Sequence, residues 1–330
     1  MMEQLIKDFP LQMKQAMEIG ANAAVRKPKN EIRNITVSGL GGSGIGGTLV
    51  KCLTDGELKV PLIVNKGYFL PEYIDKHSLV IISSYSGNTE ETYNAMQIAQ
   101  SKGAQIICVT SGGKIENEAR TNDFDLILIP GGNPPRACLG YSSIQLFYIL
   151  NKLALIPDAF LKSLEAAMEL LIAEQDEIQQ LAKGIAKRMV NKIPIIYAED
   201  TMEAVAIRFR QQINENSKML CWHHALPEMN HNELVGWRTK NEAFLPIFLR
   251  SDLEFARNAQ RAELNKVIIN DYVGEIIEII AKGNDQVQQS FYLIHITDWV
   301  SEYLGVMREM DTTEVKVIDF LKGELAKQPF

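Results

Sequence analysis

Two short segments carry side chains and backbone groups suited to binding a small anion. The first, SSYSGNTEET at residues 83–92, has small hydroxyl side chains at Ser84, Ser86 and Thr89 and contains no Lys or Arg. Hydroxyls donate hydrogen bonds to phosphate oxygens, while backbone N–H groups and the dipole of a following helix supply the positive end. An N-cap for that helix needs only one hydroxyl. We therefore expect these three side chains to hold a phosphate ester.

The second segment is glycine-rich, SGLGGSGIGG at residues 38–47. It matches the spelling of a dinucleotide fingerprint, which also requires an acidic residue about 20 positions further on. The next predicted strand ends instead in Asn65 and Lys66, which argues against NAD. Glycines still let a backbone approach an anion at a helix N-terminus. We expect Gly42 and Ser43 to join the phosphate site; a tight strand–helix turn without a ligand is the alternative.

Both segments follow apolar runs that predict β-strands and precede helical patterns. Strands are expected at 31–39, 60–65, 78–84, 104–113 and 124–132, and again at 192–200, 242–251 and 275–281. The segment 157–189 is predicted to be helical throughout. Strands that alternate with helices form parallel sheets, and ligands bind beyond the carboxyl ends of such strands. The predicted fold class is therefore α/β.

The length of 330 residues favours two domains. We expect an N-terminal helical segment at 1–30 and a first domain with the anion-binding loops at 31–156. A connecting helix at 157–190, a second domain at 191–310 and a C-terminal helix at 311–330 follow. Two similar domains in one chain favour a site between them.

The composition is that of an ordinary globular protein, 46% hydrophobic and 23% charged. A formal net charge of −7 argues against binding to nucleic acid. No apolar run reaches membrane-spanning length, and acidic residues interrupt the N-terminus too early for a signal peptide. Four scattered cysteines are typical of reduced thiols, so we expect a cytoplasmic protein with no membrane partner.

Several motifs together carry a resemblance to a known family. The two loops resemble the phosphosugar-binding sugar isomerase (SIS) fold. INENSK, LPEMNHNELVGW and PPRA, at 213–218, 226–237 and 134–137, are similar to motifs of the bifunctional phosphoglucose/phosphomannose isomerases. The resemblance runs from Ser38 to the closing helix. It implies two SIS-type doubly wound domains, each with a mainly parallel sheet flanked by helices.

The same resemblance implies an activity. It is the reversible conversion of glucose 6-phosphate, and of mannose 6-phosphate, to fructose 6-phosphate through a cis-enediol, with no metal and no cofactor. Such a reaction needs a base to move a proton between C1 and C2 and a cation to stabilise the enediolate. Glu215 matches the family's base, and its neighbours Asn214 and Asn216 are placed to orient it.

The resemblance assigns three further residues. His231 would open the sugar ring and, in the family, reaches the site from the partner subunit, which implies a homodimer. Arg136, after two prolines, would stabilise the enediolate. Lys322 would place a cation near the reacting end of the substrate, with Lys316 as the nearby alternative.

One position departs from the family pattern. Val315 stands where dual-specificity members have a threonine, although Thr312 and Thr313 lie just before it. If Val315 replaces that threonine, activity on mannose 6-phosphate is less secure than activity on glucose 6-phosphate. The family motif gives no role to His223 or His224.

Two other functions stay open. A non-catalytic SIS protein could sense a phosphosugar, but it would not need Glu215, His231 and Arg136 together, and residues 1–30 are too few for a DNA-binding domain. A zinc-dependent phosphomannose isomerase could use His223, His224 and His231. Their spacing does not favour a metal site, because a proline separates the pair from His231.

Overall fold

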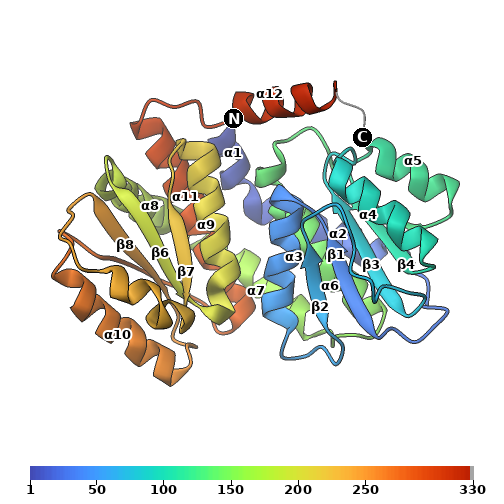
Figure 1. Ribbon diagram of the computed structural model, residues 1–330, viewed down its shortest axis with the longest axis horizontal. Coiled ribbons are helices and arrows are strands. Elements are labelled where there is room, and N and C mark those ends of the chain that lie inside the picture. The colour runs from blue at the N-terminus through green and yellow to red at the C-terminus, as the bar shows by residue number, and fades with distance from the viewer. Residues whose placement is uncertain (328–330) are drawn as a thin grey trace.

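The computed structural model describes residues 1–327 and contains two parallel β-sheets, which lie side by side (Figure 1). The strand order is β2-β1-β3-β4-β5 in the first sheet and β7-β6-β8-β9 in the second. Every neighbouring pair of strands is parallel. The α/β fold with two doubly wound sheets is therefore confirmed.

The first half builds its sheet from five strands, and the central strand β3 is buried along its whole length because helices cover both faces. The strands are β1 (Asn34–Ser38), β2 (Leu62–Asn65), β3 (Ser78–Ser84), β4 (Gln105–Thr110) and β5 (Asp125–Leu128). The helices are α1 (Met2–Lys7), α2 (Phe9–Asn22), α3 (Gly41–Thr54), α4 (Glu90–Ser101), α5 (Gly113–Thr121), the short 3₁₀ helix η1 (Pro135–Ala137) and α6 (Leu139–Lys152).

The second half repeats the alternation. Its strands are β6 (Ile193–Glu199), β7 (Trp222–Leu226), β8 (Phe244–Arg250) and β9 (Ile277–Ile280). Its helices are η2 (Asp200–Met202), α9 (Glu203–Ser217), η3 (Glu228–His231), η4 (Glu233–Gly236), α10 (Ala256–Asn270), α11 (Gln286–Met307) and α12 (Lys316–Leu325). Strand β7 is not among the predicted strands. It is an edge strand that pairs only with β6, and its sequence WHHAL lacks an apolar run.

The segment predicted as a single connecting helix forms two helices. They are α7 (Ala159–Ala173) and α8 (Gln175–Met189), with Glu174 between them. The expectation of one continuous helix is wrong at this residue. Both helices pack against α11, and α7 also contacts α2, so this segment contributes to the core. The predicted domain limits stay a prediction.

One hydrophobic core extends through both halves. It includes Ile35 of the first sheet, Ile247 of the second, and most of α11, where Trp299 is fully buried. Truncation of such a side chain to alanine typically costs about 3–5 kcal/mol. The shared core holds α3 and α9 against each other between the two sheets (Figure 1).

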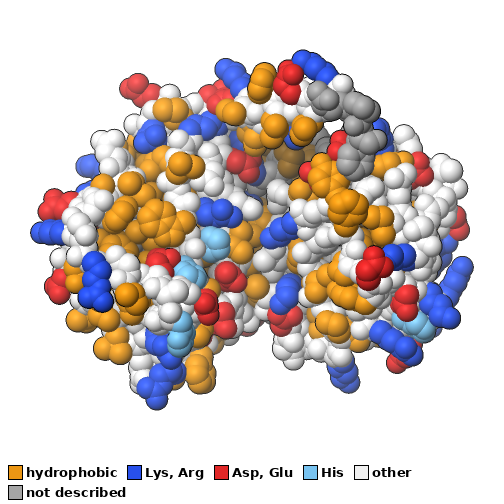
Figure 2. All heavy atoms as spheres, viewed as in Figure 1, with side chains coloured by type: hydrophobic (Ala, Val, Ile, Leu, Met, Phe, Trp, Pro, Cys, Tyr) orange, Lys and Arg blue, Asp and Glu red, His pale blue; other side chains and the backbone are white. Residues whose placement is uncertain are grey.

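Helix α12 lies outside this core. Every one of its residues is exposed, including Val317 and Phe320. It crosses between the two halves at the top of Figure 1, and the surface below it is hollowed in Figure 2. Within residues 1–327, no helix is long and apolar enough to cross a membrane.

Candidate active site

The two predicted loops lie at the switch point of the first sheet. In the order β2-β1-β3-β4-β5, the strand order reverses between β1 and β3, and sheets of this kind bind ligands outside the carboxyl ends of the strands at this point. The glycine-rich loop follows β1 and the hydroxyl loop follows β3. The backbone N–H of Tyr85 donates to Ser43 Oγ at 3.1 Å. A Cβ on Gly39 would lie 2.7 Å from the Ser83 carbonyl oxygen, so the loops form one surface.

The hydroxyl loop keeps its side chains away from helix capping. Thr89 is the N-cap residue of α4, but its side chain makes no capping hydrogen bond. The buried Ser84 Oγ donates to Thr89 Oγ1 at 3.0 Å, and the exposed Ser86 Oγ accepts from the Asn88 backbone N–H at 3.3 Å. The hydroxyls of Ser84, Ser86 and Thr89 therefore do not cap α4 and remain available for a ligand.

The glycine-rich loop brings the start of α3 against η1. A Cβ on Gly42 would lie 2.5 Å from the carbonyl oxygen of Pro135, so only glycine allows this approach. Ser43 is buried, and its hydroxyl accepts the Tyr85 N–H. Glycine at position 42 therefore has a structural reason, because it lets η1, which carries Arg136, lie against the start of α3.

Arg136 and Glu215 form an ion pair, although 79 residues separate them in the chain. Arg136 Nη1 lies 3.5 Å from Glu215 Oε2, and the side chain of Arg136 is 4% exposed against 30% for Glu215. Arg136 Nε donates to Asn216 Oδ1 at 2.7 Å, and Nη2 donates to the carbonyls of Thr312 and Thr313 at 2.8 and 2.9 Å.

These contacts leave Arg136 with little freedom. A guanidinium group carries five N–H donors, and those on Nε and Nη2 are all engaged with Asn216, Thr312 and Thr313. Burial lowers the pKa of Arg136, while the neighbouring carboxylate of Glu215 acts in the opposite direction. Arginine remains charged in proteins. Only Nη1 can therefore offer a charged donor to a ligand beside Glu215.

A buried ion pair between Arg208 and Asp298 contacts the backbone of Arg136. Arg208 Nη2 donates to Asp298 Oδ2 at 2.6 Å and to the Arg136 carbonyl oxygen at 3.0 Å. Gln212 adds a hydrogen bond to Asp298 at 3.1 Å. Burial raises the pKa of Asp298, and Arg208 opposes that shift. The pair thus ties η1 of the first half to α9 and α11 of the second.

The asparagines beside Glu215 have different partners from those expected. Asn214 donates to the Met219 carbonyl oxygen at 2.6 Å. Asn216 donates to Ser301 Oγ at 3.0 Å and accepts from Arg136. Among the hydrogen bonds of residues 1–327, neither asparagine contacts the Glu215 carboxylate. Asn216 orients the guanidinium group, and the Glu215 carboxylate pairs with Arg136.

Comparisons with known proteins bear on this site. A model of the bacterial phospho-glucose isomerase C-terminal SIS domain matches residues 178–325. A bifunctional phosphoglucose/phosphomannose isomerase of Caldicellulosiruptor bescii is 40% identical over 98% of both chains. Another, of Aquifex aeolicus, is 34% identical over 92% of this chain and 93% of its own. The chain belongs to the bifunctional phosphoglucose/phosphomannose isomerase family.

A solved structure supports the fold of this family member. The C-terminal domain of glucosamine-fructose-6-phosphate aminotransferase from Francisella tularensis matches with a TM-score of 0.73. The match covers 95% of this chain and 98% of that chain, at 14% sequence identity. At that identity the likeness concerns the fold alone.

Two residues singled out by the resemblance to phosphoglucose/phosphomannose isomerases lie apart from the ion pair. His231 is exposed at the end of η3, and Lys322 is exposed on α12. No hydrogen bond or ion pair within residues 1–327 joins either side chain to Glu215 or Arg136. Lys316, the alternative to Lys322, begins α12 and is also exposed.

The other two histidines of this segment make local contacts. His224 Nδ1 lies 2.9 Å from Glu233 Oε2. The other carboxylate oxygen of Glu233 accepts a hydrogen bond from the Tyr197 hydroxyl. Burial, together with the nearby charge of Arg210, lowers the pKa of His223 to about 4. In the described part of this isomerase-family chain, no group of three or more His, Cys, Asp or Glu side chains is placed to hold a metal ion.

Sequence reasoning missed several residues of the site. Arg208, Asp298 and the carbonyls of Thr312 and Thr313 come from distant segments, and no local pattern connects them. Asn216 lies inside the quoted motif INENSK, so its sequence signal was present and its role was misassigned.

Proposed function

We propose that this chain converts glucose 6-phosphate, and mannose 6-phosphate, reversibly to fructose 6-phosphate through a cis-enediol. The proposal rests on one observation above all, the Arg136–Glu215 pair at 3.5 Å beside the loops of the first sheet's switch point. A base and a cation next to an anion-binding crevice are what aldose–ketose isomerisation requires. A sensor of phosphosugars would have no need for this pair.

The phosphate of the substrate is held by the two loops. Ser84, Ser86 and Thr89 donate hydroxyl hydrogen bonds, and Gly42 and Ser43 bring the N-terminus of α3 to the anion. The absence of carboxylates from residues 83–89 keeps this crevice free of like charge. The hexose then extends toward Arg136 and Glu215.

The proton transfer uses Glu215. In the forward direction its carboxylate removes the proton from C2 of the open-chain aldose, and the electron pair of that C–H bond forms the C1–C2 double bond of the enediolate. Arg136 Nη1 stabilises the negative charge that develops on O1. The proton on O2 then moves to O1, Glu215 returns its proton to C1, and C2 becomes the ketone carbonyl, so no oxidant or reductant is consumed.

The proposed enzyme is a homodimer in which His231 of each subunit completes the site of its partner. His231 is exposed and outside the ion-pair network of its own chain, which is what a residue donated across an interface requires. The imidazole would move protons during ring opening. Lys322 of α12 would supply a further cation near the reacting end. If Val315 replaces the threonine of the family pattern, it determines the preference between the two aldoses.

We further propose that the enzyme works in the cytoplasm without a metal or cofactor. All four cysteines are free thiols, and two of them, Cys108 and Cys138, are buried. Such thiols suit a reducing compartment.

A coupled assay of the purified full chain, run in EDTA with each aldose phosphate separately, tests the proposed function. We expect turnover of both substrates, at rates that EDTA dialysis leaves unchanged. Turnover of glucose 6-phosphate alone would remove the mannose activity from the proposal and implicate Val315. Loss of activity in EDTA that zinc restores would replace it with the metal-dependent mechanism.

A further inference from the structure

The residue that follows α9 has a backbone conformation that is unusual for its type. Lys218 adopts the left-handed region, with φ 54° and ψ 42°, directly after the helix that carries Glu215. Glycine is the residue usually found at such a position, because it has no Cβ to strain. The Lys218 side chain makes contacts that a glycine at this position could not make.

The Lys218 ammonium group connects two segments. Nζ donates to the carbonyl oxygen of Glu215 and, at 2.8 Å, to that of Glu314, and it lies 3.8 Å from the Glu314 carboxylate. The side chain is 23% exposed. It therefore joins the base-bearing end of α9 to residues 312–315, the segment that leads into α12.

Arg136 also binds the segment 312–315. Its Nη2 donates to the carbonyls of Thr312 and Thr313, while Nη1 pairs with Glu215. The contacts thus close a ring that runs from Glu215 to Arg136, along residues 312–314, through Lys218 and back to Glu215. Each member restrains the next, so the position of the Glu215 carboxylate relative to the guanidinium depends on Lys218.

We propose that Lys218 is a positioning residue for the isomerisation, one that fixes the backbone of Glu215 against the root of α12. This inference rests on the proposed function, in which Glu215 is the base. Lys218 touches backbone carbonyls and acts through Glu215 and Arg136. The hydrogen bond from Lys218 to the Glu314 carbonyl also holds the chain just before α12 begins at Lys316. Helix α12 carries Lys322.

A purely structural role is the alternative. Cations near a helix C-terminus satisfy its free carbonyls and interact favourably with the helix dipole. Such a cap contributes to stability but has no reason to separate turnover from substrate binding. In a variant without backbone strain at position 218, a positioning role therefore predicts a lower kcat with little change in KM, whereas a purely structural role does not.

The test is Lys218→Gly in the full chain, with kcat and KM for glucose 6-phosphate and the thermal midpoint measured together. Glycine suits the left-handed conformation, so we expect the midpoint to change by only a few degrees. The phosphate loops are untouched, so KM should stay within about threefold. We expect kcat to fall by roughly 10- to 100-fold, and ethylammonium chloride, but not sodium chloride, to restore part of it.

Two further variants make the outcome unambiguous. Lys218→Asn, whose side chain tolerates the left-handed region, should lose kcat like the glycine variant. Ala154→Gly is the matched control, because Ala154 has φ 57° after α6 and is exposed. It should leave kcat and KM unchanged.

Four results would count against the inference. If kcat of both Lys218 variants stays within threefold of the unaltered chain, or if KM rises as much as kcat falls, Lys218 is not a positioning residue. If ethylammonium restores nothing in a folded glycine variant, the ammonium group is not what matters. If the unaltered chain itself turns over no aldose phosphate, the proposed function fails first, and the inference fails with it.

Discussion

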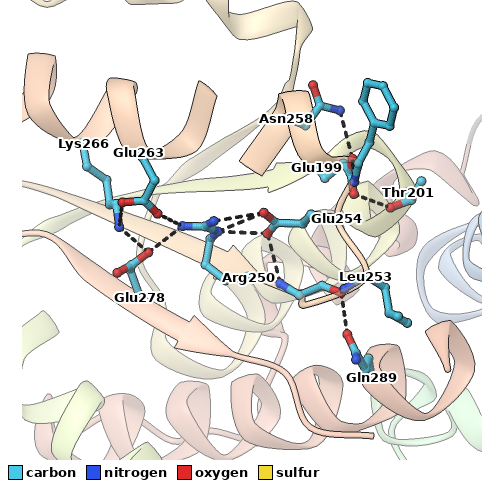
Figure 3. A network of polar contacts seen from close by, with 12 residues as sticks. Glu199, Thr201, Arg250, Leu253, Glu254, Asn258, Glu263, Lys266, Glu278 and Gln289 are labelled. Atoms are coloured by element: carbon cyan, nitrogen blue, oxygen red, sulfur yellow. Dashed lines mark hydrogen bonds and ion pairs between the residues drawn. The ribbon is translucent and has the colours of Figure 1, made fainter. Parts of the chain in front are cut away.

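The carboxyl edges of the two sheets have the same layout but different contents. The strand order reverses between β1 and β3 in the first sheet and between β6 and β8 in the second, which is where sheets of this kind bind ligands. In the first, the loops offer glycines and hydroxyls. In the second, two carboxylates of the chain itself lie at this edge: Glu199 ends β6, and Glu254 lies in the loop after β8 (Figure 3).

At the edge of the second sheet, the carboxylates are hydrogen-bonded by groups of the protein itself. Glu199 Oε1 accepts from the Phe255 N–H and from Asn258 Nδ2, both at 2.9 Å, at the start of α10. Glu254 Oε1 accepts from the Ser251 N–H at 3.0 Å and from Arg250 Nε at 2.9 Å. Figure 3 shows how the network continues from Arg250 through neighbouring acidic side chains.

The difference explains how two similar halves come to share one site. Backbone N–H groups at a helix start attract an anion, and in the second half the protein's own carboxylates meet that need. In the first half no carboxylate does so, and the hydroxyls of Ser84 and Thr89 bond only to each other among the described contacts. The first edge is suited to a ligand, whereas the second is suited to stability.

Introducing a carboxylate into the first edge should have the largest effect. Ser86 is exposed, so Ser86→Glu should fold normally while placing a negative charge in the proposed phosphate site. We expect KM for glucose 6-phosphate to rise at least about 100-fold, because like charges at close range repel strongly. Steady-state kinetics measure this, and neutral Ser86→Gln should raise KM less than tenfold. Equal effects of the two variants would show that charge is not the cause.

Removing one hydroxyl from the first edge should have a smaller effect. Ser84→Ala deletes a proposed donor to the phosphate, and one hydrogen bond to a charged group is worth about 1.5–3 kcal/mol. We therefore expect KM to rise about 10- to 100-fold with kcat nearly unchanged. Ser83→Ala is the matched control, since Ser83 is buried in the same strand and its hydroxyl has no partner among the described residues. A larger KM effect for Ser83→Ala would contradict the assignment of Ser84.

The second edge should respond in stability alone. Glu254 is 5% exposed and pairs with Arg250, which also contacts Glu263 and Glu278. Because those other acids remain, Glu254→Gln should lower the free energy of unfolding by only about 1–3 kcal/mol. Urea denaturation measures the loss. KM for glucose 6-phosphate should not change, and a rise in KM would mean that the second edge also serves the substrate.

The sequence predicts much of this arrangement, because most strands are apolar runs between helical patterns. It does not predict β7, where WHHAL has too few apolar residues to show a strand pattern. The loops after β1 and β3 could be placed at one edge from the order of elements alone. The ion pair of Arg136 with Glu215 could not, since it depends on how the two halves pack.

The resemblance to a known family identified both members of that pair, but not what holds them. Arg208 and Asp298 meet through the packing of α9 on α11, and the carbonyls of Thr312 and Thr313 have no signal in side-chain types at all. The contacts of Lys218 depend on the left-handed backbone conformation of that one residue. Such contacts become visible only when distant segments are placed together.

The most direct test of the account is turnover by Glu215→Gln, measured together with the dissociation constant for glucose 6-phosphate. Glutamine keeps the size of the side chain but cannot accept the proton. We expect kcat to fall by about 10³-fold, within the range for loss of a general base, while the dissociation constant changes by less than tenfold. A variant that keeps kcat within tenfold of the unaltered chain would contradict the assignment of Glu215 as the base.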